Sequence, residues 1–116
     1  MFNFEKLEVW QKTIIFAGVI YRLTRTFPKD EQFGLTNQIR RAVNSIASNI
    51  AEGSARPAAD FARFIGYATG SLFEVVTQST IARNEGLLRD EDYEKLYADA
   101  EEISRMLSGL RRSLGE

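Results

Sequence analysis

The chain has 116 residues and contains no cysteine, no histidine and only two prolines. These absences exclude a disulfide framework, thiolate and imidazole metal ligands, and Ser-His, Cys-His or histidine acid–base catalysis. Neither sign of charge dominates, because fifteen Lys and Arg residues against sixteen Asp and Glu residues give a net charge of −1. General attraction to nucleic acid therefore cannot come from the overall charge, and any basic surface must be local.

Long apolar runs are also missing. The longest, Ile14 to Ile20, is interrupted by Gly18 and is far shorter than the roughly 20 residues that cross a bilayer. The first residues include Glu5 and Glu8 and lack the basic start and apolar core of a signal peptide. We therefore expect a soluble, cytoplasmic protein that does not contact a membrane.

The chain contains several segments with helical periodicity, separated by a few proline and glycine residues. Pro28, Gly53, Pro57 and Gly86 separate segments whose apolar residues recur at steps of three and four, and no segment alternates with period two. The sequence predicts four helices, over residues 5–27, 35–53, 57–85 and 90–114. Because the connectors are short, consecutive helices should be antiparallel, which predicts an all-α, single-domain, up-down-up-down four-helix bundle over residues 1–116.

Two of the predicted helices carry more apolar surface than one bundle can bury. In the helix over 5–27 we assign the stripe through Ile14 to the core, and a second stripe, about 200° away at Phe16, to another subunit. In the helix over 57–85 a Gly-x-x-x-Gly pattern lies opposite the apolar face, with a tight crossing inside the bundle as the alternative explanation. We expect a cyclic homo-oligomer whose subunit interface comprises Val9, Phe16, Ile20, Leu23, Phe27, Gly66, Gly70 and Phe73.

A polar stripe follows the second predicted helix at helical spacing. We expect Glu74, on the neighbouring antiparallel helix, to pair with Arg40 or Arg41 and so to fix the helix register, although ligand binding by this stripe stays open. A carboxylate pair of Glu52 and Glu74 could support acid–base work, but bundle metal sites of this kind also use histidine. We expect no enzyme, no cofactor, no metal and no small-molecule substrate. The stripe comprises Gln38, Arg41, Ser45, Asn49, Glu52 and Glu74.

Basic residues are concentrated before the last predicted helix. Residues 90–116, in contrast, hold more acidic than basic residues. Repeated around a ring, a weak basic site would gain avidity, so RNA is one candidate ligand and another protein is the alternative. No aromatic stacking platform is evident beside these residues. The candidate nucleic-acid-binding residues are Arg22, Arg25, Lys29, Arg40, Arg41, Arg56 and Arg63.

Several segments resemble one known family. Phe33 to Ala42, Ser45 to Arg56, Gly70 to Glu74 and the opening Phe4 to Gln11 are similar to the four-helix-bundle proteins encoded by intervening sequences within bacterial 23S rRNA genes. The resemblance implies a homopentameric ring. Members of the family that are encoded inside rRNA genes are suspected of binding RNA. The resemblance extends to the accessory proteins of diversity-generating retroelements, basic pentameric barrels that bind reverse transcriptase and nucleic acid, from which this chain differs in its net charge. We therefore expect a non-enzymatic, oligomeric binding or scaffold protein, with RNA binding as the alternative.

Overall fold

Four long helices account for most of the chain. The computed structural model describes all 116 residues, with no strand among them. Its helices are α1 (Glu8–Thr24), α2 (Asn37–Ser54), α3 (Ala58–Asn84) and α4 (Asp90–Ser113), and short turns form η1 (Asn3–Lys6), η2 (Lys29–Glu31) and η3 (Gln32–Thr36). The predicted all-helical architecture with four helices is confirmed.

The ends of the helices follow from local backbone chemistry. Pro57 is extended and precedes α3, whereas Gly86 follows α3 with a φ of 76°, in the left-handed region that glycine favours. The prediction for the first helix was too long at both ends. Leu7 is extended and separates η1 from α1, and the helix ends at Thr24, before Pro28.

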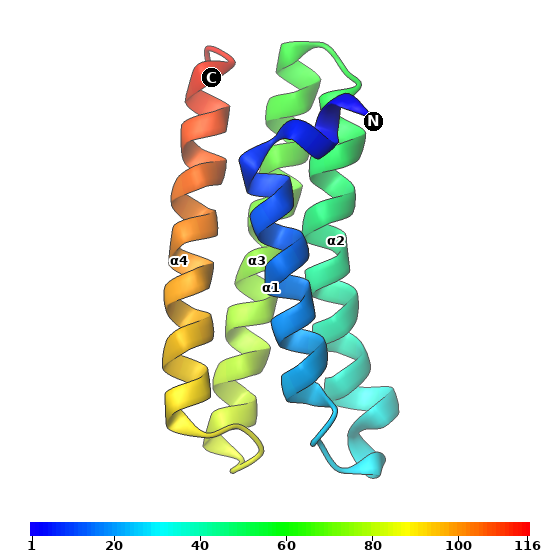
Figure 1. The fold of residues 1–116 in the computed structure, drawn as a ribbon, viewed down its shortest axis with the longest axis vertical. Coiled ribbons are helices and arrows are strands. Elements are labelled where there is room, and N and C mark those ends of the chain that lie inside the picture. Colours follow the sequence, from blue (N-terminus) through cyan, green and yellow to red (C-terminus); the bar gives the residue numbers. More distant parts are fainter.

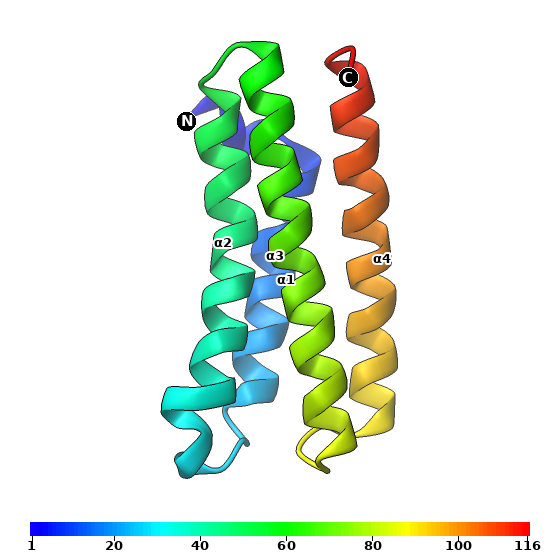
Figure 2. The same cartoon turned by 180° about the vertical axis from the view of Figure 1, so that it is seen from behind.

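The helices lie side by side, and consecutive ones run in opposite directions (Figure 1). Each helix packs against the next, and α4 also packs against α1, which leaves α1 and α3 on opposite sides of the molecule. Figure 2 shows the same arrangement from behind, with α3 in front of α1. None of the four helices is apolar over a stretch long enough to cross a membrane.

The core buries the stripe of α1 that was predicted to face another subunit. The stripe predicted for the core packs half-buried against it, except for the exposed Ile14; its half-buried members are Leu7, Trp10, Ala17 and Tyr21. Val9, Phe16, Ile20 and Phe27 are buried within this single chain, and Leu23 packs half-buried against them. The four buried residues therefore cannot form the subunit interface to which the sequence pattern assigned them.

Two buried threonines explain this error. Thr13 and Thr24 interrupt the apolar pattern of the stripe that is actually buried, but each hydroxyl donates a hydrogen bond to a carbonyl one turn earlier, Val9 O at 2.7 Å and Ile20 O at 2.8 Å. A buried hydroxyl whose hydrogen bond is made locally costs little, so the stripe functions as a core face.

Helices α2 and α3 have the most intimate contact in the molecule. Gly53 is buried inside α2, and a Cβ placed there would lie 2.6 Å from Phe64 Cβ and 2.9 Å from Phe61 Cδ1. Further along, the Ser71 hydroxyl donates to Ser45 Oγ at 3.1 Å. These contacts fix the register in which residues of α2 face residues of α3.

Candidate interaction surfaces

An apolar surface extends over α3 and α4, and we call it the α3–α4 face. It consists of the exposed side chains Phe73 of α3 and Tyr97 of α4, and Phe73 is 58% exposed. A groove of about 320 Å³ separates the two helices at this face. Its lining residues are Leu72, Phe73, Val76, Thr77, Tyr97, Ala100, Glu101 and Ser104.

The glycines of the Gly-x-x-x-Gly pattern open onto the outside of α3. A Cβ added at Gly66 or Gly70 would meet no atom within 4 Å, so no helix of the same chain approaches them closely. A tight crossing inside the bundle therefore does not explain these glycines. The interface role of Gly66, Gly70 and Phe73 remains a prediction.

A second apolar patch lies on α1, on the other side of the molecule. Ile15 is 65% exposed, and its neighbour Ile14 is also exposed although the sequence pattern assigned it to the core. We call these two residues the α1 patch. Because α1 and α3 occupy opposite sides of the bundle (Figures 1 and 2), the α1 patch and the α3–α4 face point in different directions.

Between α2 and α3 lies a polar groove of about 440 Å³. Glu74 and Arg41 both line it, as the helix register predicted, yet neither forms an ion pair within the chain. The expected pairing of these residues is therefore not present. Glu52 does not line this groove, so the chain does not bring Glu52 and Glu74 together. The groove residues are Gln38, Arg41, Ala42, Ser45, Ser71, Glu74 and Gln78.

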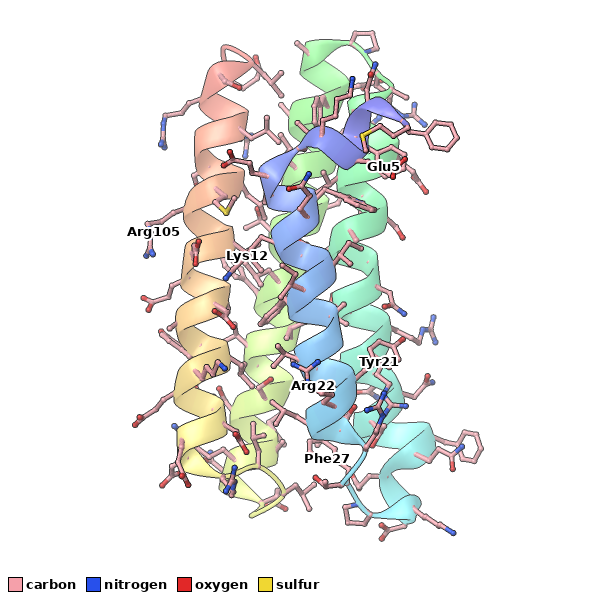
Figure 3. All side chains as sticks on the ribbon, viewed as in Figure 1. Glu5, Lys12, Tyr21, Arg22, Phe27 and Arg105 are labelled. Carbon is pink, nitrogen blue, oxygen red and sulfur yellow. The ribbon has the colours of Figure 1, made fainter.

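Arg40 turns away from this groove toward α1. Its Nε donates to Thr24 Oγ1 at 2.9 Å, and its guanidinium lies 4.8 Å from the centre of the Tyr21 ring. Figure 3 shows Tyr21 on the side of α1 that faces α2. Arg40 thus links α1 to α2 and is not the partner of Glu74. Asn49, the remaining member of the predicted stripe, donates to Ser45 O and Oγ on its own helix.

The seven candidate nucleic-acid-binding residues separate into two groups. Arg22, Arg25, Lys29, Arg40 and Arg41 lie near the connection between α1 and α2, and Figure 3 shows Arg22 there. Arg56 and Arg63 lie at the connection between α2 and α3, at the opposite end of a molecule whose longest dimension is 42 Å. A single basic rim that contains all seven residues does not form, because one full helix length separates the groups.

Arg56 and Arg63 are also engaged within the chain. Both lie near Asp60, with Arg63 Nη2 3.0 Å from Asp60 Oδ1, and both stack over the Phe64 ring. Hydrogen bonds to Tyr67 and then to Asp60 raise the pKa of Arg63. The two hydrogen bonds of Arg63 occupy donors that a phosphate would need.

Phe33 is an exposed aromatic residue that was not among the residues predicted from the sequence. It belongs to η3, in the connection between α1 and α2, and it is 86% exposed. The only signal in the sequence is its position in a connector between Pro28 and the second predicted helix, where no helical face is available to bury it. An aromatic side chain therefore accompanies the larger basic group at this end of the molecule.

A charged contact joins α1 to α4. Lys12 Nζ lies 3.2 Å from Glu102 Oε2 and 3.4 Å from Asp99 Oδ1, and Figure 3 shows Lys12 between the two helices. The hydrogen bond to Glu102, supported by Asp99, raises the pKa of Lys12 above its ordinary value of 10.5. Elsewhere, no group of three or more Asp or Glu side chains is placed to hold a metal ion.

The chain is therefore an all-α protein of four long helices with exposed apolar side chains, in which no group of three or more acidic side chains is placed to hold a metal ion. A family model described as 23S rRNA-intervening sequence protein matches residues 5–109, so the chain belongs to this family. The family predicted from the sequence motifs is thus confirmed.

Solved structures are similar to this chain, and one of them matches nearly its whole length. It is a protein of unknown function from the S23 ribosomal protein family of Bacteroides thetaiotaomicron, 26% identical, with a TM-score of 0.81. The match covers 89% of this chain and 97% of that chain. No curated protein matches this chain.

Proposed function

We propose that this chain is a non-enzymatic scaffold protein, an up-down-up-down bundle that assembles through head-to-tail contacts into a closed ring. Five subunits are the number that the family resemblance implies. The observation that carries the proposal is the exposure of apolar side chains on two different sides of one subunit, the α3–α4 face and the α1 patch. Each large apolar side chain left in water forfeits about 1.5 to 3 kcal/mol.

The positions of the two surfaces favour a ring over a symmetric dimer. A two-fold dimer joins the same surface of both copies, whereas a ring joins two different surfaces of successive copies. The α3–α4 face supplies a groove beside Phe73, and the α1 patch supplies two adjacent isoleucines on the opposite side. An isoleucine side chain is of a size and polarity that suits this groove, in which Glu101 is the one charged residue.

Light scattering on mixed variants tests this arrangement. Phe73→Glu should block the α3–α4 face and Ile15→Glu should block the α1 patch, so each variant alone should be a 13.2 kDa monomer at micromolar concentration. Each variant keeps the surface that the other has lost. An equal mixture should therefore form a two-subunit species through one intact contact, but no ring.

Circular dichroism supplies the control, because both substituted positions are exposed and helicity should be unchanged. A wild-type chain that is monomeric at micromolar concentration would overturn the proposal. A mixture that stays monomeric would contradict the head-to-tail contact.

Nucleic-acid binding is a second candidate, and Phe33 is the observation that favours it. The exposed side chain belongs to the connection that carries Arg25 and Lys29, and Arg41 follows in the first turns of α2. Aromatic rings next to basic residues are the usual platform for single-stranded nucleic acid, since every base can stack on a ring. A ring of subunits would repeat this platform around one rim and increase its avidity.

A further inference from the structure

The polar groove between α2 and α3 has an unusual composition for an open surface feature. Six of its seven lining residues are polar, Ala42 being the exception, and none is aromatic. Its volume of about 440 Å³ is within the range that small-molecule sites occupy. The groove shares no residue with the α3–α4 face or the α1 patch.

The register of α2 and α3 arranges the groove side chains in three facing levels. The Ser71–Ser45 hydrogen bond of 3.1 Å sets the first level. Because the helices are antiparallel and rise about 1.5 Å per residue, Arg41 then faces Glu74 about one turn further along. Gln38 faces Gln78 at the third level. A cation and an anion therefore lie opposite each other, between a hydroxyl pair and an amide pair.

Much of the hydrogen-bonding capacity in this groove is unused within the chain. Neither Arg41 nor Glu74 forms an ion pair, and Gln78 Oε1 is buried without a hydrogen-bond partner. Ser45 Oγ accepts hydrogen bonds from Asn49 Nδ2 and from Ser71, which leaves the Ser45 hydroxyl proton without an acceptor. Buried polar atoms of folded proteins normally have partners, so Gln78 Oε1 points to a polar ligand, and the exposed charges of Arg41 and Glu74 are free to bind it.

We propose that this groove binds a free α-amino acid with a polar side chain. The ligand carboxylate would accept hydrogen bonds from Arg41, and its ammonium group would donate to Glu74. Since the two charged groups of an α-amino acid are close together, they match a cation and an anion that face each other at one level. The side chain would then extend toward the amides of Gln38 and Gln78.

The same features disfavour other small ligands. Because Ala42 is the one apolar residue in the lining and no aromatic side chain is present, the groove makes few favourable contacts with an apolar or aromatic molecule. A phosphate group would meet Arg41 but would be repelled by Glu74 on the facing wall. A ligand of zero net charge with separated charges complements a lining that holds one cation and one anion.

Calorimetric titration of the full-length protein with L-glutamine tests the proposal. Saturable binding is expected, and two analogues should bind at least about tenfold more weakly: L-glutamine amide, which lacks the carboxylate charge, and N-acetyl-L-glutamine, which lacks the ammonium charge. L-leucine, which keeps both charges but cannot use the amide pair, should also bind more weakly than L-glutamine.

Variants of the protein assign each charge to its partner. Arg41→Gln should lower the affinity for L-glutamine to that of the wild-type protein for L-glutamine amide. Glu74→Gln should lower it to that of the wild-type protein for N-acetyl-L-glutamine. Arg105→Gln is the matched control, because Arg105 points away from the bundle on α4 and should leave binding unchanged (Figure 3). Both groove positions are exposed, so the variants should fold.

Three results would overturn the proposal. The first is the absence of binding to the wild-type protein when L-glutamine is titrated up to about 10 mM. A dissociation constant above that concentration is too weak for specific binding. The second is binding that Arg41→Gln and Glu74→Gln leave unchanged. The third is loss of binding together with loss of assembly in light scattering, which would place Arg41 and Glu74 in a subunit contact. Intact assembly without amino-acid binding would overturn this proposal alone and leave the proposed ring standing.

Discussion

Gly53 and Gly66 both lie within helices, yet their surroundings differ in whether they leave room for a larger side chain. Gly53 lies where α2 meets Phe61 and Phe64, and there is no room for a methyl group. Gly66 opens onto the outside of α3, where a methyl group would meet nothing. The sequence pattern indicated only a helix stop at Gly53, whereas the structure places it inside α2 as the point of closest helix contact. Composition and spacing cannot distinguish these two environments, because the difference depends on which residues of the neighbouring helix lie opposite.

Gly53→Ala should destabilise the fold. The new Cβ would lie 2.6 Å from Phe64 Cβ, which is too close for any non-bonded carbon pair, so α2 and α3 must separate. Overpacking of this kind costs about 1 to 3 kcal/mol, and the better helix propensity of alanine offsets about 1 kcal/mol of it. Urea unfolding followed by circular dichroism measures the difference.

The matched control for Gly53→Ala is Gly109→Ala in α4. An added Cβ there makes only an ordinary contact, 3.8 Å from Arg112 Nη2, so this substitution should stabilise the fold by up to about 1 kcal/mol. Equal effects of the two substitutions would contradict the close approach at Gly53.

At the scale of the helices, periodicity predicted which segments are helical but not which face of α1 is buried. α2, α3 and α4 begin and end within two residues of their predicted bounds. For α1 the fully buried stripe contains Thr13 and Thr24, which a hydrophobic pattern counts against burial, so this stripe was assigned to a subunit interface. The stripe assigned to the core packs against it half-buried, except for Ile14. The hydroxyl groups of these threonines donate hydrogen bonds to backbone carbonyls of the same helix, which makes burial possible. A pattern of apolar residues does not reveal such hydrogen bonds.

Lys12 should stabilise the contact between α1 and α4 through its charge. Lys12→Met keeps most of the aliphatic stem but removes the ammonium group, and we expect a loss of about 0.5 kcal/mol near neutral pH, typical of a partly exposed ion pair. The folded-state pKa of Lys12 lies above 10.5, so its contribution is fully present below that pH. The contribution should be lost as the pH rises through the folded-state pKa.

Urea unfolding of wild type and Lys12→Met at a series of alkaline pH values measures this difference. Lys95→Met is the control, because Lys95 is exposed on the same helix pair and forms no ion pair. A Lys12→Met difference that stays constant with pH would show that the aliphatic stem, and not the charge, carries the effect.

At the scale of the whole molecule, the number of basic residues is evident from the sequence but their placement is not. Arg41 and Arg56 are only fifteen positions apart, yet they lie near opposite ends of α2. Arg56 and Arg63 were grouped with the others because they precede the acidic last helix. Their contacts with Asp60 and Phe64 form where Arg56, in the connection before α3, meets the first turns of that helix. The arrangement that remains is one end with Arg22, Arg25, Lys29 and Arg41, joined by Phe33.

If that end binds RNA, Phe33→Ala should weaken the binding of a single-stranded 23S rRNA fragment by roughly tenfold. Stacking of one base on an aromatic ring is worth about 1 to 3 kcal/mol, and a side chain that is 86% exposed makes almost no contact within the chain that its removal could disturb. Filter binding across a range of salt concentrations measures the effect. Affinity should fall steeply with added salt, since contacts to phosphate release counterions, and the Phe33→Ala variant should keep the same salt dependence because the ring carries no charge.

Phe2→Ala is the matched control for Phe33→Ala. Phe2 is also an exposed aromatic residue, but it precedes η1, at the end of the molecule away from η3 (Figure 1). Equal losses in the two variants would mean that RNA meets exposed rings without preference for the basic end. A wild-type protein that binds no fragment even at low salt would exclude RNA, because a molecule with a net charge of −1 can attract phosphates only through local groups of cations. The scaffold ring would then be the function that the two apolar surfaces support.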